Sequence, residues 1–190
     1  MRICVYGASS NVIAQNYIEA GEALGRAMAK RGHSLVFGGG ASGMMGAAAR
    51  GMTEGKGEII GVAPTFFDVD GILYPDCTEF IFTETMRQRK SIMEERADAF
   101  IMTPGGIGTF EEFYEILTLK QLGRHSKPIA ILNVADYYRP IITMQEQAIA
   151  QNFMKPECAD LCGWFEDAEQ LLDYLEQEVK TANVEDLKYI

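Results

Sequence analysis

A switch from an apolar run to a helical pattern, made through consecutive glycines, most constrains how this chain can fold. The apolar run Ala99–Met102 is followed by Thr103-Pro104-Gly105-Gly106-Ile107-Gly108-Thr109-Phe110-Glu111-Glu112. Proline and glycine end a strand, and the periodic apolar residues from Phe110 to Leu122 predict a helix directly afterwards. The first N–H groups of such a helix have no partner within it and lie at the positive end of its dipole, so this turn can bind an anion such as phosphate.

Two carboxylates, Glu111 and Glu112, follow this turn. Because like charges repel, a carboxylate beside a bound phosphate indicates chemistry on the ligand rather than binding alone. A second interpretation needs no ligand. Thr109-Phe110-Glu111-Glu112 fits a capping box, in which Thr109 begins the helix and the Glu112 side chain returns to the backbone three residues earlier.

The rest of the chain alternates apolar runs with helical patterns. The predicted strands are Arg2–Tyr6, Ser34–Phe37, Glu58–Val62, Glu79–Thr83, Ala97–Met102 and Pro128–Asn133. The predicted helices are Tyr17–Lys30, Met44–Thr53, Thr85–Arg96, Phe110–Leu122, Tyr138–Ala150, a short one at 153–160, and Ala168–Val179. This alternation predicts an α/β fold, a three-layer, doubly wound (Rossmann-like) parallel sheet with helices on both faces. No repeat or linker divides the chain, so we expect residues 1–190 to form a single Rossmann-like nucleotide-binding domain.

Composition limits the partners of such a fold. At 190 residues, with 47% hydrophobic and 23% charged residues, the chain can bury a substantial core. Its net charge of −10 argues against nucleic acid and anionic membranes, which need a basic face, but not against a small anionic ligand.

The N-terminal residues Met1–Tyr6 are predicted to be a strand rather than a signal peptide. No apolar run approaches the roughly 20 residues that span a bilayer, so we expect a cytoplasmic protein. The four cysteines lack CxxC spacing and are expected to be reduced, with a redox or metal role for Cys158 and Cys162 as the alternative.

Two further small-residue turns follow predicted strands, and therefore fall at the same edge of the sheet as the Pro-Gly-Gly turn. They are Gly7-Ala8-Ser9-Ser10 and Gly38-Gly39-Gly40-Ala41-Ser42-Gly43. Parallel sheets bind ligands at this edge, so Ser9, Gly39 and Gly40 are candidate ligand contacts. The second turn matches G-x-G-x-x-G, but Ala63-Pro64 stands where an acidic residue would bind a ribose, which disfavours NAD or FAD. Nucleotide contact and simple close packing of helix on sheet both remain open.

A pair of cations lies on the inner face of the helix that Thr85 is expected to cap. At helical spacing this face gathers Met86, Arg89, Lys90, Met93 and Ala97. A buried guanidinium must be paired with a carboxylate or a bound anion. Arg89 could therefore form a structural ion pair with Glu112, the two cations could belong to a solvated helix end, or Arg89 and Lys90 could face a ligand. Together with the glycine-rich turns, these residues favour a site for a phosphorylated ligand with one ionised acid.

The sequence lacks the residue patterns that other classes of catalysis require. Neither His33 nor His125 has metal-binding spacing, so we predict no metal site. Ser9 and Ser10 lack the G-x-S-x-G context of a serine hydrolase, and no Gly-Lys-Ser/Thr completes a Walker P-loop.

The two central motifs resemble those of a known family. Pro104–Glu112 reproduces P-G-G-x-G-T-x-x-E, and Met86–Lys90 is similar to M-x-x-R-K. Both are motifs of the LOG ("Lonely Guy") family of cytokinin riboside 5'-monophosphate phosphoribohydrolases, often misnamed lysine decarboxylases. The resemblance covers nearly the whole chain, including Gly7–Ser10, Gly38–Gly46 and Gln121–Asn133.

The resemblance implies cleavage of the N-glycosidic bond of a nucleoside 5'-monophosphate, giving free base and ribose 5-phosphate without a cofactor. In the family scheme, Arg89 and Glu112 correspond to the catalytic pair. The residues that correspond to the phosphate and ribose cradle, or that line the pocket, are Gly105, Gly106, Ile107, Gly108, Thr109, Met86 and Lys90. Because cleavage builds positive charge on the sugar, an ionised Glu112 would stabilise the transition state more than the ground state. Arg89 could orient Glu112 or hold the substrate.

The identity of the base is left open by these motifs. The segment 65–78, predicted to be irregular, contains Phe66-Phe67-Asp68-Val69-Asp70 and is unlike the family pattern, so either AMP or an N6-modified adenine nucleotide could be the substrate. Family members are commonly homodimers, which would let the helix Phe110–Leu122 bury a second face. A non-catalytic nucleotide-binding or signalling module is the alternative function, and lysine decarboxylation, which needs pyridoxal phosphate, is a third.

Overall fold

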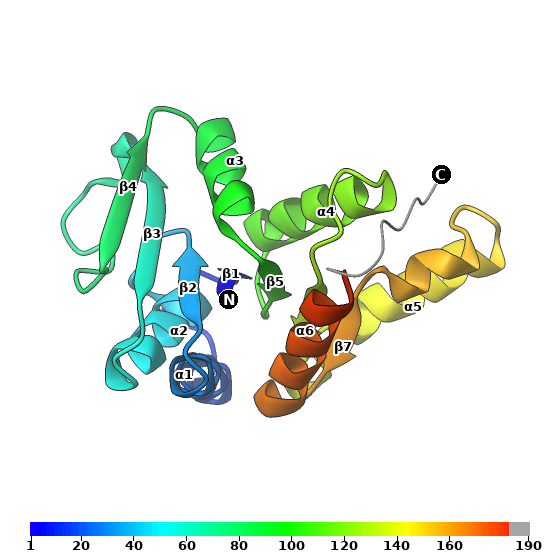
Figure 1. Ribbon diagram of the computed structural model, residues 1–190, viewed down its shortest axis with the longest axis horizontal. Coiled ribbons are helices and arrows are strands. Elements are labelled where there is room, and N and C mark those ends of the chain that lie inside the picture. The colour runs from blue at the N-terminus through cyan, green and yellow to red at the C-terminus, as the bar shows by residue number, and fades with distance from the viewer. Residues whose placement is uncertain (183–190) are drawn as a thin grey trace.

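The structure is a computed structural model that describes residues 1–182 of the chain. Seven strands form one sheet in the order β4-β3-β2-β1-β5-β6-β7, and all neighbouring strands are parallel (Figure 1). Their bounds are β1 (Arg2–Tyr6), β2 (Ser34–Phe37), β3 (Ile59–Pro64), β4 (Glu79–Thr83), β5 (Ala99–Met102), β6 (Ile129–Leu132) and β7 (Gly163–Phe165). The order reverses between β1 and β5, which makes the carboxyl ends of these two central strands the switch point of the sheet.

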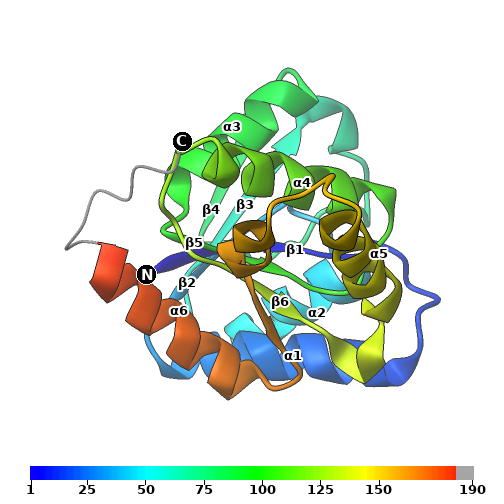
Figure 2. The ribbon, with the colours of Figure 1, turned by 90° about the vertical axis from the view of Figure 1, so that its right-hand side faces the viewer.

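Helices cover both faces of this sheet, as Figure 2 shows. One face carries α1 (Gln15–Lys30), α2 (Gly43–Glu54) and α6 (Ala168–Ala182), and the other carries α3 (Met86–Arg96) and α4 (Ile107–Gln121). Each face has its own core: Leu24, Met52 and Leu172 belong to the first, and Met93 and Phe113 to the second. The predicted three-layer α/β fold is confirmed.

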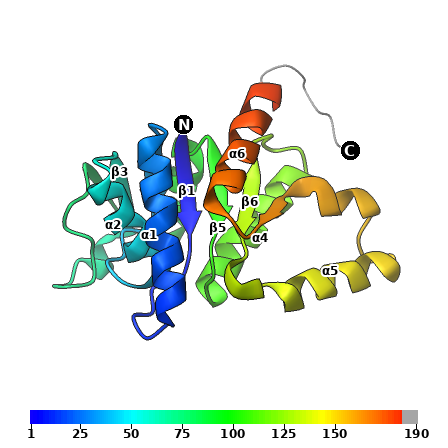
Figure 3. The ribbon, with the colours of Figure 1, turned by 90° about the horizontal axis from the view of Figure 1, so that it is seen from below.

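The remaining helix, α5 (Arg139–Ala150), extends from the body of the molecule (Figure 3). None of its residues is buried, although it carries the apolar side chains Ile142, Met144 and Ile149. Three short 3-10 helices complete the described residues, at Thr65–Phe67, Val134–Asp136 and Pro156–Leu161.

Most of the predicted elements are confirmed with shifts of a few residues at their ends, and Glu79–Thr83 matches β4 residue for residue. The short helix predicted at 153–160 is confirmed in part, as a 3-10 helix that spans Pro156–Leu161, and the left-handed Asn152 (φ 63°) precedes this segment. Strand β7 is absent from the sequence prediction, since Gly163–Phe165 is too short for a recognisable alternating pattern.

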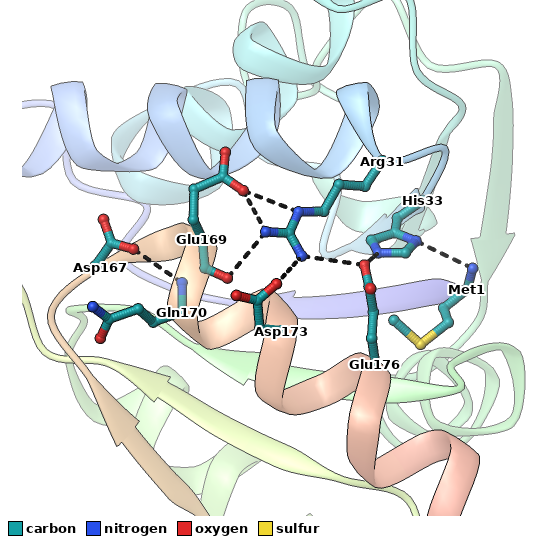
Figure 4. Close-up of polar contacts among 8 residues, drawn as sticks. All are labelled: Met1, Arg31, His33, Asp167, Glu169, Gln170, Asp173 and Glu176. Atoms are coloured by element: carbon teal, nitrogen blue, oxygen red, sulfur yellow. Dashed lines mark hydrogen bonds and ion pairs between the residues drawn. The ribbon is translucent and has the colours of Figure 1, made fainter.

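A network of charged side chains attaches α6 to the end of α1 (Figure 4). Arg31 donates from Nη1 to Asp173 (2.7 Å) and to Glu176 (3.3 Å), and its guanidinium also pairs with Glu169. His33 Nε2 lies 2.9 Å from the same Glu176 carboxylate. These contacts join segments that are far apart in the sequence and hold α6 against its face of the sheet.

Candidate active site

The Pro-Gly-Gly turn lies at the switch point of the sheet, where β5 ends and α4 begins. The N–H of Ala8 donates to Pro104 O (3.0 Å), and the Thr103 hydroxyl donates to Tyr6 O (2.9 Å). These bonds join the turn to the end of β1. The N–H groups of the first turn of α4 have no partner within the helix, so this edge has the unpaired donors that an anion needs.

Helix α4 begins at Ile107, three residues earlier than the sequence pattern indicates, and Gly106 is its N-cap without a side-chain cap bond. Thr109 therefore lies inside the first turn, where it is buried. The capping-box interpretation of Thr109 and Glu112 is wrong, because Thr109 does not begin the helix. A Cβ on Gly105 would lie 2.1 Å from the Thr109 hydroxyl, so this close approach requires glycine.

Glu112 instead pairs with Arg89 of α3. Both side chains are buried, with exposed fractions of 5% for Arg89 and 9% for Glu112. The Arg89 Nε donates to the carbonyl of Val62 in β3 (3.1 Å), which fixes the plane of the guanidinium. The structure thus brings together a cation and a carboxylate that lie on separate helices.

The start of α3 is set by a capping box of its own. Thr85 accepts from the N–H of Gln88 (3.2 Å), and the Gln88 side chain accepts from the N–H of Thr85 (3.2 Å). The prediction that Thr85 caps this helix is confirmed. Because the cap fixes where the helix begins, it also determines that Arg89 and Met93 face the sheet while Met86 stays partly exposed.

Gly38 is a site residue that the sequence analysis missed. A Cβ at this position would lie 2.0 Å from Arg89 Nη2, so the guanidinium occupies the space that any other residue would fill. The signal was present in the three consecutive glycines, but a contact between Gly38 and Arg89 depends on how β2 and α3 pack.

The neighbouring glycines contact the segment that follows β3. The N–H of Tyr74 donates to Gly39 O (2.8 Å), and Gly40 forms an isolated antiparallel bridge with Leu73. The same segment exposes apolar side chains, including Phe66 and Val69. Ligand contact by Gly39 and Gly40 stays a prediction.

Burial raises the pKa of the Glu112 carboxyl above its usual value, and the Arg89 charge opposes this shift. A carboxylate in such surroundings is less hydrated than one in water, so it interacts more strongly with charge that develops beside it. The pair can therefore place negative charge, balanced by an arginine, next to the Pro-Gly-Gly turn.

Lys90, the other predicted cation, lies beside the buried pair but closer to solvent. It pairs with Glu111 and, at 2.8 Å, with Glu115, so it links α3 to α4 in parallel with the Arg89–Glu112 pair. Ile107, Gly106, Gly108 and Ser9 are exposed at the same edge. Their accessibility agrees with a ligand-facing role, which stays a prediction.

Two tyrosines that the sequence analysis missed bind the backbone of the Pro-Gly-Gly turn. Tyr137 donates its hydroxyl to Gly105 O (2.7 Å), and Tyr138 donates to Thr103 O (2.7 Å). Both follow β6, the neighbour of β5 in the sheet. The sequence signal for them is weak, because tyrosines at the start of a helix are usually explained by packing.

Among residues 1–182, no three His, Cys, Asp or Glu side chains gather as a metal site needs. Within the same residues, no helix has both the length and the apolar character required to cross a membrane.

The fold and the buried Arg–Glu pair define an α/β protein whose candidate site lies at the carboxyl edge of its sheet. A family described as "Possible lysine decarboxylase" matches residues 45–175. A cytokinin riboside 5'-monophosphate phosphoribohydrolase of Arabidopsis thaliana is 36% identical over 178 residues, which span 94% of this chain and 84% of the relative. The enzyme of the same name from Rhodococcoides fascians is 40% identical over 141 residues, 74% of this chain and 71% of its own. The chain belongs to the family of cytokinin riboside 5'-monophosphate phosphoribohydrolases, as its two motifs predict.

Solved structures support the same fold. The molybdenum cofactor carrier protein of Chlamydomonas reinhardtii superposes with a TM-score of 0.71 at 22% identity, over 94% of this chain and 98% of the other. A molybdenum cofactor binding protein of Rippkaea orientalis also gives 0.71, at 20% identity, over 93% and 95% of the two chains. At these identities the likeness concerns the fold alone.

Proposed function

We propose that the protein hydrolyses the N-glycosidic bond of a nucleoside 5'-monophosphate, a cytokinin riboside 5'-monophosphate or AMP, to free base and ribose 5-phosphate. The observation that carries this proposal is the buried Arg89–Glu112 pair at the edge of the sheet where α4 begins. Named relatives with this activity, matched along most of the chain, support it.

The first turn of α4 holds the phosphate in this proposal. The N–H groups of Gly106, Ile107, Gly108 and Thr109 and the dipole of the helix would bind the 5'-phosphate. Ser9, Gly39, Gly40, Met86 and Lys90 are proposed to complete the substrate contacts. The phosphate would then fix the sugar at a constant distance from the start of α4, which is where the buried carboxylate lies.

Glu112 acts on the sugar. Departure of the base with the electrons of the glycosidic bond leaves positive charge on the ribose ring, and an ionised carboxylate in a poorly hydrated site stabilises that charge. The water that adds to the sugar loses a proton to a base, a role that the raised pKa of Glu112 suits, and the departing nucleobase takes up one proton in return. Arg89 keeps Glu112 ionised and oriented through its contacts with that carboxylate and with Val62 O.

The residues of the site do not fit pyridoxal phosphate, which lysine decarboxylation requires. That cofactor binds through a lysine amine that must lose its proton. Lys90, the lysine beside the site, pairs with Glu111 and Glu115, and although burial opposes it, these carboxylates hold the pKa of its ammonium above the usual value. A protonated amine cannot form the imine.

A homodimer is also part of this proposal. Tyr114 on α4, Met144 on α5 and Phe153 after it are exposed large hydrophobic side chains. A second copy would cover them. We also propose that residues 1–190 form a single domain of a cytoplasmic protein. The net charge of −10 supports the absence of nucleic-acid and anionic-membrane partners.

Incubation with AMP and with isopentenyladenosine monophosphate, followed by chromatography of the free base, tests the activity. Release of base and ribose 5-phosphate in equal amounts supports the proposal, and no base from any nucleotide tried contradicts it. A protein that binds AMP without turning it over would instead be the non-catalytic nucleotide-binding module. Carbon dioxide release from lysine with added pyridoxal phosphate is the test of the third activity.

A further inference from the structure

The turn that follows β6 has an unusual backbone. Ala135 (φ 52°) and Asp136 (φ 55°) are consecutive non-glycine residues in the left-handed region, which side chains disfavour. Side-chain bonds hold this conformation: Asn133 donates to Asp136 Oδ1 (3.1 Å) and accepts from the N–H of Tyr138 (2.7 Å). Such a conformation persists only where its surroundings over-determine it, and it often marks a functional site.

The result of this turn is that two tyrosine hydroxyls reach the backbone of the anion-binding turn. Tyr138 is 1% exposed, and its bond to Thr103 O belongs to the core of the protein. Tyr137 is 39% exposed and binds Gly105 O, the carbonyl of the first glycine in the turn. Only the second bond restrains a peptide between two glycines.

That peptide would otherwise be free to rotate. Gly105 and Gly106 lack side chains, so the peptide that joins them can flip between two orientations at little cost. Because a peptide group is planar and trans, its C=O and N–H point in opposite directions. A hydroxyl that holds the Gly105 carbonyl therefore also fixes the direction of the Gly106 N–H, at the N-cap of α4.

We propose that Tyr137 is a positioning residue for phosphate binding, which keeps the Gly106 N–H directed at the 5'-phosphate of the substrate. This inference rests on the proposed function for the identity of the ligand. Tyr137 does not touch the reacting atoms, so it affects the binding of phosphorylated ligands and leaves the chemistry of the glycosidic bond to Glu112 and Arg89.

The structure offers a conservative variant. The ring of Tyr137 packs edge-to-face against Tyr17 (centroids 5.9 Å apart) and Tyr138 (4.9 Å). These contacts do not involve the hydroxyl, so Tyr137→Phe removes the bond to Gly105 and leaves the packing. The matched control is Tyr174→Phe on α6. Tyr174 is also partly buried, and its ring packs on Phe165.

Calorimetric binding of ribose 5-phosphate, AMP and adenosine, together with kcat and KM for the nucleotide, tests the inference. For Tyr137→Phe we expect binding of both phosphorylated ligands to weaken by about fivefold to tenfold, as for the loss of one hydrogen bond, with adenosine binding and kcat changed less than about twofold. The Tyr174→Phe control should match the wild type for all three ligands.

Unchanged affinity for the phosphorylated ligands, or an equal loss for AMP and adenosine, would overturn the inference. A wild-type protein that binds no phosphorylated ligand would overturn it as well. Because these measurements are of binding, they separate the two proposals: a wild-type protein that binds ribose 5-phosphate but releases no base contradicts the proposed function, while the Tyr137→Phe comparison still decides the role of Tyr137.

Discussion

The protein places arginines in two contrasting surroundings. Arg89 has one carboxylate partner, Glu112, and both side chains are almost completely shielded from water. Arg31 has three carboxylate partners (Figure 4), which are between 31% and 71% exposed, and its own side chain is 20% exposed. The first arrangement removes two charges from water, and the second leaves its carboxylates hydrated.

The difference in burial indicates the role of each set of ion pairs. Exposed ion pairs contribute little each, but several of them can hold a helix in place at low cost. A buried pair gains more Coulomb energy but loses hydration, and apolar residues of similar volume often serve stability as well or better. The Arg31 network is thus sufficiently explained by the attachment of α6, whereas the Arg89–Glu112 pair calls for a chemical role. Variants of the two sets test this contrast.

Replacing the buried carboxylate should have the largest effect. We expect Glu112→Gln to lower kcat by at least about 100-fold, because the amide keeps the shape but cannot stabilise positive charge on the sugar or accept a proton. The measurement is base release from a nucleoside monophosphate, with AMP binding as a check that the site persists. Glu169→Gln, which alters a carboxylate paired with the other arginine, should retain wild-type kcat. Similar losses in the two variants would remove the contrast.

The next largest effect should come from Gly38, which touches the buried pair without carrying a charge. The Cβ of Gly38→Ala would displace the Arg89 guanidinium, so we expect about a tenfold to 100-fold fall in kcat, of the size that misplacement of a catalytic group produces. Gly55→Ala is the matched control, since its Cβ would meet Ala29 at 2.4 Å, in the packing of α1 on α2. The control should lower the urea midpoint without changing kcat. Equal kcat for both variants would show that Arg89 need not be placed accurately.

Local patterns were enough to predict the sheet, because its strands are continuous apolar runs ended by glycine or proline. They also predicted the turn between β5 and α4, since Pro104, Gly105 and Gly106 determine the local backbone, while anion binding by this turn stays a prediction. They could not decide between a capping box and an Arg89–Glu112 pair, because that choice depends on whether α4 begins at Ile107 or later. The contacts of Gly38 and Tyr137 were beyond prediction, as both depend on which strands become neighbours.

Disruption of the exposed network should cost stability and not activity. We expect Arg31→Met to lower the free energy of unfolding by about 1 kcal/mol at low ionic strength, because three carboxylates lose their partner, and by less in 1 M salt, which screens exposed charges. Urea unfolding at two salt concentrations measures this, with kcat expected to stay at the wild-type value. A loss that does not depend on salt would show that Arg31 acts through packing of its aliphatic stem and not through its charge.

The smallest effect should be the contribution of His33 to the pH dependence of stability. Burial lowers the pKa of His33 below its usual value of 6.5, and the hydrogen bond to Glu176 only partly opposes this shift. The unfolded chain then takes up a proton at a higher pH than the folded protein, so the stability contributed by His33 is complete above about pH 6.5 and is lost as the pH falls towards the folded-state pKa.

Burial also lowers the pKa of His125, whose Nε2 lies 2.8 Å from Ile116 O, so part of the pH dependence of stability persists without His33. In His33→Gln the urea midpoint should therefore still fall between pH 7.5 and pH 5, but less steeply than in the wild type. The effect on stability should be smaller than that of Arg31→Met. Parallel plots of urea midpoint against pH for the variant and the wild type would mean that the carboxylates around His33 compensate for its burial. The Arg31 network would then be as insensitive to mild acid as ion pairs that are fully exposed.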